Sequence, residues 1–327
     1  MSSMSLTDRS RIAILLAMSL MTASAISATT ARTSAFAQAQ AYNWRNVTIK
    51  GGGFVSGIVF HPTEQGIVYA RTDVGGAYRW SAANGKWVPI TDWIGKDESN
   101  YTGIESLALD QLDPRRVYLA SGTYTQSWAG TGAFLGSTDL GATWRIASVP
   151  FKMGGNEDGR SNGERLMVDP NDNSILFFGS RKDGLWRSSD HGATWNRTLS
   201  FPVTNTPNGV GISFVQFVKS SGSPGSPTPV VYLGVSQAGA SVYRTTDAGA
   251  TWQSVADQPA GVVPHHAALE SNGMLYIAYS DGPGPNGATR GAVWKHDTTS
   301  GTWTNITPPT GQGGFAGVSV DPQRPGT

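Results

Sequence analysis

Short apolar runs separated by polar turns extend along most of the chain. The runs are rich in Val, Ile, Leu, Phe and Tyr, and Gly, Pro and Asp mark the turns, a pattern that indicates β-strands rather than helices. The runs recur in sets of an inner strand, a second strand, a third strand and a fourth strand. Inner strands are expected at residues 55–60, 105–109, 164–168, 211–215, 266–270 and 314–320. Second strands are expected at residues 67–70, 117–120, 175–178, 230–233 and 275–278.

An eight-residue motif, Ser/Thr-x-Asp-x-Gly-Ala-Thr-Trp, follows three of the expected third strands. It begins at Ser137, Ser188 and Thr245, at intervals of 51 and 57 residues. A repeat period near 50 is typical of propellers, and the motif resembles the Asp-box, whose Asp accepts backbone N–H groups inside a hairpin turn. The aspartates of the three motifs are Asp139, Asp190 and Asp247. We therefore predict an all-β fold, a β-propeller with four-stranded blades, in which these aspartates stabilise turns.

The end of the chain bears on the number of blades. The pattern accounts for five full blades and the inner strand of a sixth, and the chain ends at Thr327, where the next strand would begin. A propeller closes its last blade on its first, since an open blade leaves sheet edges exposed. We expect residues 41–327 to be an incomplete N-terminal β-propeller domain.

The N-terminus reads as a targeting segment. Arg9 and Arg11 precede an apolar run at residues 12–26, and small residues follow, with cleavage expected near Ala37 or Ala39. A membrane anchor is the alternative, but the run is short for a spanning helix and Ser and Thr interrupt it. We assign residues 1–40 to a signal peptide and its cleavage region, and expect a secreted protein with no membrane association after cleavage.

Composition narrows the function classes. Charged residues make up only 14% of the chain, against about 25% in typical globular proteins, and 41 Gly and 11 Trp fit many short strands and tight turns. The net charge of +1 gives no reason to expect nucleic-acid binding. There is no Cys, and the five His show no metal-ligand spacing, so we expect neither a metal site nor a cofactor.

The first blade departs from the repeat. Its Arg-Thr-Asp-Val-Gly-Gly segment places Asp73 after the second strand, whereas the Asp-box aspartates follow the third. Because neighbouring blade strands run in opposite directions, Asp73 is expected at the opposite end of the propeller. The two glycines leave room for a ligand, and function in repeat scaffolds concentrates in such loops. Spacing alone leaves open whether Asp73 is a functional carboxylate or another turn residue.

Polar and aromatic residues gather in other loops expected at the same end. Trp and Tyr faces stack on sugar rings, while amide and guanidinium groups bond hydroxyls, so such a surface suits a neutral polysaccharide. Blade packing is the alternative for each aromatic residue, and Glu164 and Arg165 could simply pair with each other. The candidate binding residues are Tyr124, Trp128, Asn156, Arg160 and Asn162.

Several segments closely resemble glycoside hydrolase family 74, the xyloglucanases and reducing-end-specific oligoxyloglucan cellobiohydrolases. They are residues 42–47, 51–62, 69–80, 150–156 and 159–166. The resemblance implies two tandem seven-bladed propellers with a cleft between them, and inverting hydrolysis of xylose-decorated β-1,4-glucans. It assigns the general base to Asp73 and places the five candidate binding residues in the cleft. We expect the protein to be a monomer.

The resemblance places the general acid in the second propeller, beyond residue 327. We therefore expect residues 41–327 alone to be inactive or nearly so, because general acid catalysis contributes about 10²–10⁴-fold. The competing interpretation is a non-catalytic Asp-box propeller that binds glycans or proteins, sialidase-like or sortilin-like. A sialidase needs three converging arginines, and although Arg71, Arg160 and Arg165 exist, the neutral polar loops argue against it. An assembly factor with Asp-box repeats would lack the Asp73 loop.

Overall fold

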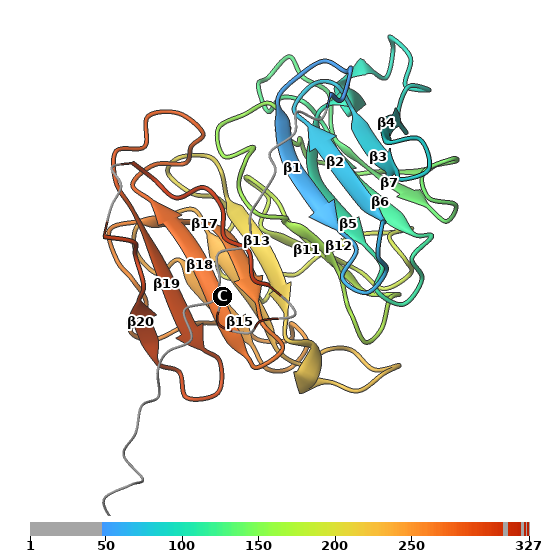
Figure 1. Ribbon diagram of the computed structural model, residues 1–327. Helices are drawn as coiled ribbons and strands as arrows, with labels where there is room; N and C mark the ends of the chain where they lie inside the picture. Colours follow the sequence, from blue (N-terminus) through green and yellow to red (C-terminus); the bar gives the residue numbers. More distant parts are fainter. Residues whose placement is uncertain (1–47, 310–312, 322–323, 325, 327) are drawn as a thin grey trace, which may run out of the picture. The chain divides into compact units, whose positions relative to one another are not determined.

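The structure is a computed structural model that describes residues 48–309, 313–321, 324 and 326. The expected signal peptide and the first residues of the expected domain lie outside the described residues. Within the described ranges, twenty strands form five antiparallel sheets of four strands each (Figure 1). In every sheet the strands pair in chain order, so each sheet is a four-stranded meander. The predicted all-β propeller with four-stranded blades is confirmed.

The blades follow one another along the chain. Blade 1 contains β1 (Val55–Phe60), β2 (Val68–Thr72), β3 (Ala77–Ser81) and β4 (Lys86–Pro89). Blade 2 contains β5 (Ile104–Leu109), β6 (Val117–Ser121), β7 (Ala133–Ser137) and β8 (Arg145–Ser148). Blade 3 contains β9 (Leu166–Val168), β10 (Leu176–Gly179), β11 (Leu185–Ser188) and β12 (Asn196–Arg197). Blade 4 contains β13 (Ile212–Phe217), β14 (Val231–Val235), β15 (Val242–Thr245) and β16 (Gln253–Ser254). Blade 5 contains β17 (Val263–Leu269), β18 (Met274–Ser280), β19 (Gly291–Asp297) and β20 (Trp303–Asn305).

Two 3₁₀ helices lie in loops: η1 (Ser99–Thr102) in the connection from blade 1 to blade 2, and η2 (Lys219–Ser221) between β13 and β14 of blade 4. No helix in the described part of the chain has the length and apolarity needed to cross a membrane.

Several expected inner strands differ from the structure in their bounds, and two of the differences have a clear backbone cause. β9 begins at Leu166 rather than at Glu164, because the backbone around Glu164 leaves the ladder: its carbonyl accepts from Val215 N (3.0 Å) in blade 4. Residues 314–320 form no strand. The N–H of Phe315 donates to the carbonyl of Tyr279 (3.2 Å), so this segment lies beside β18 with irregular backbone.

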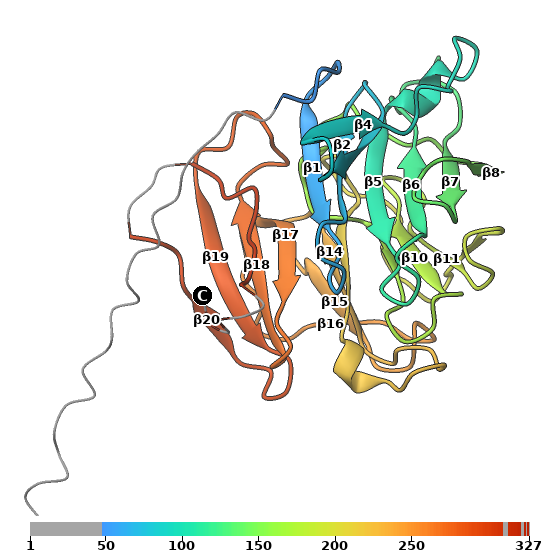
Figure 2. The same cartoon turned by 45° about the vertical axis from the view of Figure 1, so that its right-hand side comes forward.

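The hydrophobic core lies between consecutive blades. Figures 1 and 2 show the sheets side by side, and β2 contacts β5, β5 contacts β9, β10 contacts β13, and β13 contacts β17. One cluster joins Tyr69 and Ile90 of blade 1 to Leu107, Leu119 and Leu135 of blade 2, all of them buried. Similar clusters fill the other three blade interfaces. Because the apolar surface is removed from water between blades, each blade is held mainly by its neighbours.

The three Asp-box turns share one hydrogen-bond pattern. In the first, Asp139 Oδ1 accepts from the hydroxyl of Ser137 (2.7 Å) and the N–H of Thr143 (2.8 Å), while Oδ2 accepts from the hydroxyl of Thr143 (2.6 Å). Leu140 and Gly141 both have positive φ (63° and 89°), the geometry of a type I′ hairpin turn. The turns at Asp190 and Asp247 repeat these bonds. These three carboxylates are therefore fully engaged inside their own turns.

Candidate functional site

Asp73 lies in the tight turn that joins β2 to β3. The carbonyl of Gly76 accepts from the N–H (3.0 Å) and the hydroxyl (2.8 Å) of Thr72, which closes the turn, and Gly76 has a φ of +78°. The Asp-box turns join third to fourth strands instead. Since the strands of a meander are antiparallel, the Asp73 turn and the Asp-box turns lie at opposite ends of the blades.

The two carboxylate oxygens of Asp73 have different surroundings. Oδ1 accepts from the N–H of Phe54 (2.7 Å), and Oδ2 lies 3.4 Å from Nε of Arg160. The Arg160 guanidinium also lies over the ring of Phe54, 5.7 Å from its centroid. Gly53, with φ +87°, comes so close that a Cβ there would lie 2.6 Å from Oδ1. Asp73 is 6% exposed, so its carboxylate is held in a fixed, largely desolvated position beside a cation.

The predicted binding residues Tyr124, Trp128 and Asn156 lie together. Asn156 Nδ2 donates to the hydroxyl of Tyr124 (2.7 Å), and the rings of Tyr124 and Trp128 lie 5.2 Å apart in a tilted arrangement. Trp128 is 71% exposed, which fits a stacking surface and does not fit blade packing.

Gly103 lies between the loop that carries Tyr124 and Trp128 and the turn that carries Asp73. A Cβ at Gly103 would lie 2.6 Å from Cα of Thr123 and 2.9 Å from the carbonyl oxygen of Asp73. The absence of a side chain lets the two loops approach each other. Gly155 comes equally close to Gly103, so the loop that carries Asn156 and Arg160 packs against the same point.

Asn162 is placed differently from the other candidates. It is only 3% exposed, and neither of its side-chain amide atoms has a protein hydrogen-bond partner among the described residues. Its Nδ2 lies near Gly159, where a Cβ would be 3.2 Å away. The amide is thus buried beneath the loop, and only its neighbour Arg160 reaches Asp73.

Glu164 and Arg165 do not pair with each other. Neighbouring residues of an extended segment point to opposite sides, so their side chains diverge. Glu164 Oε1 lies 2.7 Å from Nε of Arg71, whereas Nη1 of Arg165 lies 3.2 Å from Oε1 of Glu105. The suggested pair is therefore wrong, and two separate ion pairs take its place.

The Glu105 cluster is fully buried. Its carboxylate also pairs with Arg181 and accepts from the N–H of Gly154 (2.9 Å). Burial raises the pKa of Glu105, but Arg181, Arg165 and the Gly154 N–H outweigh burial, and the net pKa lies below its usual value. Burial lowers the pKa of Arg165 to about 10, so both partners remain charged at neutral pH.

Sequence reasoning missed both buried clusters. Glu105 and Glu164 each lie just before the apolar residues of an expected inner strand, and this buried-strand position for a carboxylate was the signal available. His266 of β17 approaches the Arg71–Glu164 pair, and burial together with Arg71 lowers its pKa although Glu164 opposes the change.

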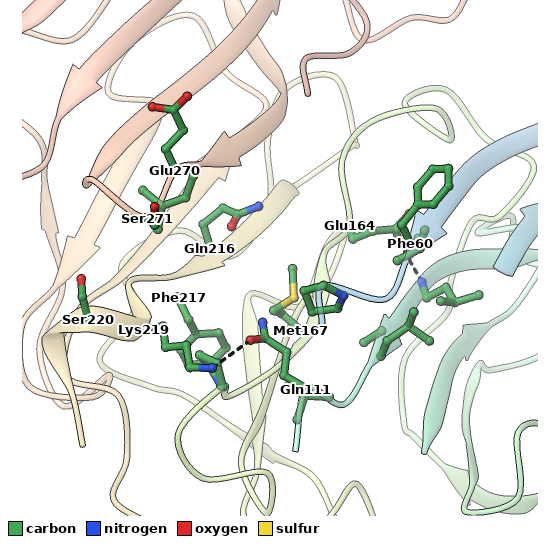
Figure 3. A pocket seen from close by; sticks show the side chains of 18 residues that line it. Phe60, Gln111, Glu164, Met167, Gln216, Phe217, Lys219, Ser220, Glu270 and Ser271 are labelled. Atoms are coloured by element: carbon green, nitrogen blue, oxygen red, sulfur yellow. Dashed lines mark hydrogen bonds between the residues drawn. The ribbon is translucent and has the colours of Figure 1, made fainter. Parts of the chain in front are cut away.

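A cavity of about 550 Å³ is lined by the inner strands of all five blades (Figure 3). Its apolar lining includes Phe60, Leu107, Met167, Phe217 and Leu269. The turns that follow the inner strands also line it, so it opens at the end that carries the Asp-box turns. Asp73 is not among its lining residues. We place the candidate site at Asp73 because charged, amide and aromatic groups converge there.

Within the described ranges, no group of three or more His, Cys, Asp and Glu side chains is arranged to hold a metal ion. The chemistry available at Asp73 is that of a carboxylate beside a guanidinium and an amide–aromatic surface. A carboxylate so placed can accept a proton or bind hydroxyl groups.

The fold and the site define a β-propeller with a polar, aromatic loop surface at one end. The chain is 52% identical over 309 residues to a xyloglucanase from Paenibacillus sp., covering 89% of this chain and 30% of that protein. It is 50% identical over 303 residues to a xyloglucanase from Acetivibrio thermocellus, covering 87% and 36%. The crystal structure of a glycoside hydrolase family 74 xyloglucanase from Xanthomonas campestris superposes with a TM-score of 0.80 at 48% identity, covering 87% of this chain and 43% of that one.

No family model matches the chain. The chain spans about a third of the length of the relatives it matches. The sequence and structural matches confirm the resemblance to glycoside hydrolase family 74.

Proposed function

We propose that this chain carries the base side of an active site that hydrolyses xyloglucan or related β-1,4-glucans with inversion. The observation that carries the proposal is the placement of Asp73. It is the motif-like aspartate that lies at the opposite end from the Asp-box turns, and its Oδ2 faces Arg160 rather than a turn hydroxyl. The relatives described as xyloglucanases support the substrate class.

In the proposed reaction Asp73 acts as general base. It removes a proton from a water molecule as the water attacks the anomeric carbon, and an acid on the other face of the sugar protonates the leaving oxygen. Carboxyl groups in inverting enzymes stand roughly 6.5–9.5 Å apart to leave room for the water. Arg160 and Phe54 hold the Asp73 carboxylate in one orientation, which such a water needs.

Tyr124, Trp128 and Asn156 form the proposed sugar-binding surface. The exposed Trp128 ring offers an apolar face, and the Tyr124 hydroxyl and Asn156 amide offer hydrogen bonds to sugar hydroxyls. The low charge of the chain suits an uncharged polysaccharide.

We further propose that the general acid is supplied from outside residues 41–327. Purified residues 41–327 are then expected to release no xyloglucan oligosaccharides, while the product of the complete gene releases them. Measurable hydrolysis by residues 41–327 would overturn this part of the proposal. For the complete product, ¹H NMR of the first released reducing ends should show the α-anomer; an initial β-anomer contradicts inversion.

Secretion and a monomeric state also belong to the proposal. Intact-mass analysis of protein from the culture medium is expected to show an N-terminus at Gln38 or Gln40, after cleavage at Ala37 or Ala39. Light scattering is expected to give the mass of one chain. A product that retains residues 1–37 in a membrane fraction contradicts the secretion proposal.

A further inference from the structure

Arg71 is the most completely bonded arginine near the proposed base. It lies on β2, two residues before Asp73, and is 1% exposed. Its Nε donates to Oε1 of Glu164 (2.7 Å), and its Nη1 donates to the hydroxyl of Ser56 (2.9 Å).

The remaining contacts of Arg71 reach the loop that carries Arg160. Nη1 donates to the carbonyl of Arg160 (2.8 Å), and Nη2 donates to the carbonyl of Asn162 (3.0 Å). Both acceptors are backbone groups, so the guanidinium fixes the path of the loop rather than a side chain. β2 therefore carries the group that anchors this loop, and the turn that follows β2 carries the proposed base.

Glu164 fixes Arg71 in turn. Its Oε2 accepts from the hydroxyl of Ser106 (2.6 Å) and the N–H of Leu107 (2.7 Å), both on β5. Figure 3 shows Glu164 at the edge of the inter-blade cavity, and its side chain is 13% exposed there. The pair thus joins blades 1, 2 and the start of blade 3 at a point next to the proposed site.

We propose that Arg71, held by Glu164, is a positioning residue that sets the distance between the Arg160 guanidinium and the Asp73 carboxylate. The inference rests on the proposed function, because it assigns Arg71 a task only if Asp73 acts as base. A misplacement of about 1 Å at a catalytic group can cost about 100-fold in rate.

A lysine cannot replace Arg71 in this task. Its ammonium is a single point charge, whereas the guanidinium presents a planar fork of donors that reaches Glu164 and the two loop carbonyls together. Arg71→Lys keeps the charge opposite Glu164 but loses the fork. In the complete gene product we expect kcat on xyloglucan to fall about 10–100-fold with KM changed less than about threefold.

Arg165 provides a matched control. It is equally buried and also pairs with a glutamate, but its Nη1 reaches the carbonyl of Val210 rather than the loop carbonyls at residues 160 and 162. Arg165→Lys is expected to lower the melting temperature like Arg71→Lys and to leave kcat within about twofold. Equal kcat losses in the two variants would show that Arg71 acts only on stability and would overturn the proposal.

A milder variant keeps the test decisive if Arg71→Lys fails to fold. Ser56→Ala removes one hydrogen bond of Nη1 and is expected to lower kcat several-fold with an unchanged KM; an unchanged kcat overturns the proposal. Asp73→Asn distinguishes a failure of the proposed function from a failure of the positioning role of Arg71. If Asp73→Asn retains full activity, the proposed function itself fails. If it is inactive while Arg71→Lys and Ser56→Ala match the wild type, only the positioning role fails.

Discussion

Oδ2 of Asp73 lies 3.4 Å from Nε of Arg160, although 87 positions separate the two residues in the chain. Asp73 comes from the β2–β3 turn of blade 1 and Arg160 from the loop that enters blade 3. The contact exists because the two loops fold over the same end of the propeller. It distinguishes Asp73 from the Asp-box aspartates, whose carboxylates bond residues within four positions of themselves.

The exposed ring of Trp128 should contribute to ligand binding and little to folding. Trp128→Ala is expected to weaken the binding of xyloglucan oligosaccharides to residues 41–327 about tenfold, which corresponds to about 1.4 kcal/mol. The melting temperature should stay within a degree or two, because the side chain is 71% exposed. Isothermal titration calorimetry checks the affinity.

Leu112→Ala is a suitable control for Trp128→Ala. Leu112 is also exposed, but it lies in the turn after β5, at the end that carries the Asp-boxes. Equal affinity losses in the two variants would contradict a binding surface at Trp128.

The fold was predictable from the sequence because its determinants are local. Asp139, Gly141 and Thr143 form their turn within one eight-residue motif, and each blade pairs strands that are adjacent in the chain. For the same reason Asp73 could be distinguished from the Asp-box aspartates: it follows a second strand of its blade, whereas they follow third strands.

The interior of the site was not predictable in this way. Arg71 pairs with Glu164 across 93 positions, and Glu105 pairs with Arg181 across 76. Such pairs depend on how blades pack side by side, which no single spacing encodes. The exposure of the loop residues could not be predicted from the sequence either. Asn156 donates to the hydroxyl of Tyr124 at the loop surface, whereas Asn162, six residues later, is buried.

Three histidines whose pKa is lowered in the folded protein should make its stability depend on pH. Burial lowers the pKa of His265 and His266, and burial together with Arg244 lowers that of His296 to about 4. Each folded-state pKa lies below the unfolded value of about 6.5, so between these values the unfolded chain binds protons that the folded chain does not. The stabilisation that comes from keeping these three histidines neutral is therefore fully present above about pH 6.5, and it is lost as the pH falls toward 4.

His296→Phe tests this dependence. The ring of His296 stacks on Trp303 with centroids 4.3 Å apart, and Phe can keep that contact while removing the titrating group. Melting temperatures measured from pH 7.5 to 4.5 should fall less steeply in the variant. An identical slope in variant and wild type would show that His296 does not contribute.

The Asp-box carboxylates should make the folding stability depend on pH in a more acidic range. Hydrogen bonds from the hydroxyls and N–H groups of Thr143 and Thr251 lower the pKa of Asp139 and Asp247 to about 2. Because the unfolded pKa is near 3.9, their contribution is complete above about pH 4 and disappears as the pH falls toward 2. Asp139→Asn with Asp247→Asn should lower stability at pH 7 and reduce the further loss between pH 4 and 2.

Chemical denaturation at several pH values checks the Asp-box prediction. Asp97→Asn, at an exposed position, is the control and should change neither the stability at pH 7 nor the acid dependence. A pair of Asp-box substitutions that behaves like this control contradicts the turn-stabilising role.

The most direct test of the account compares Asp73→Asn with Asp139→Asn in the complete gene product. Both replace an aspartate with its isosteric amide, one facing Arg160 and one inside an Asp-box turn. If Asp73 is the general base, kcat on xyloglucan should fall about 10²–10⁴-fold in Asp73→Asn and stay close to wild type in Asp139→Asn. A kcat that Asp73→Asn leaves within a few-fold of wild type would contradict the assignment.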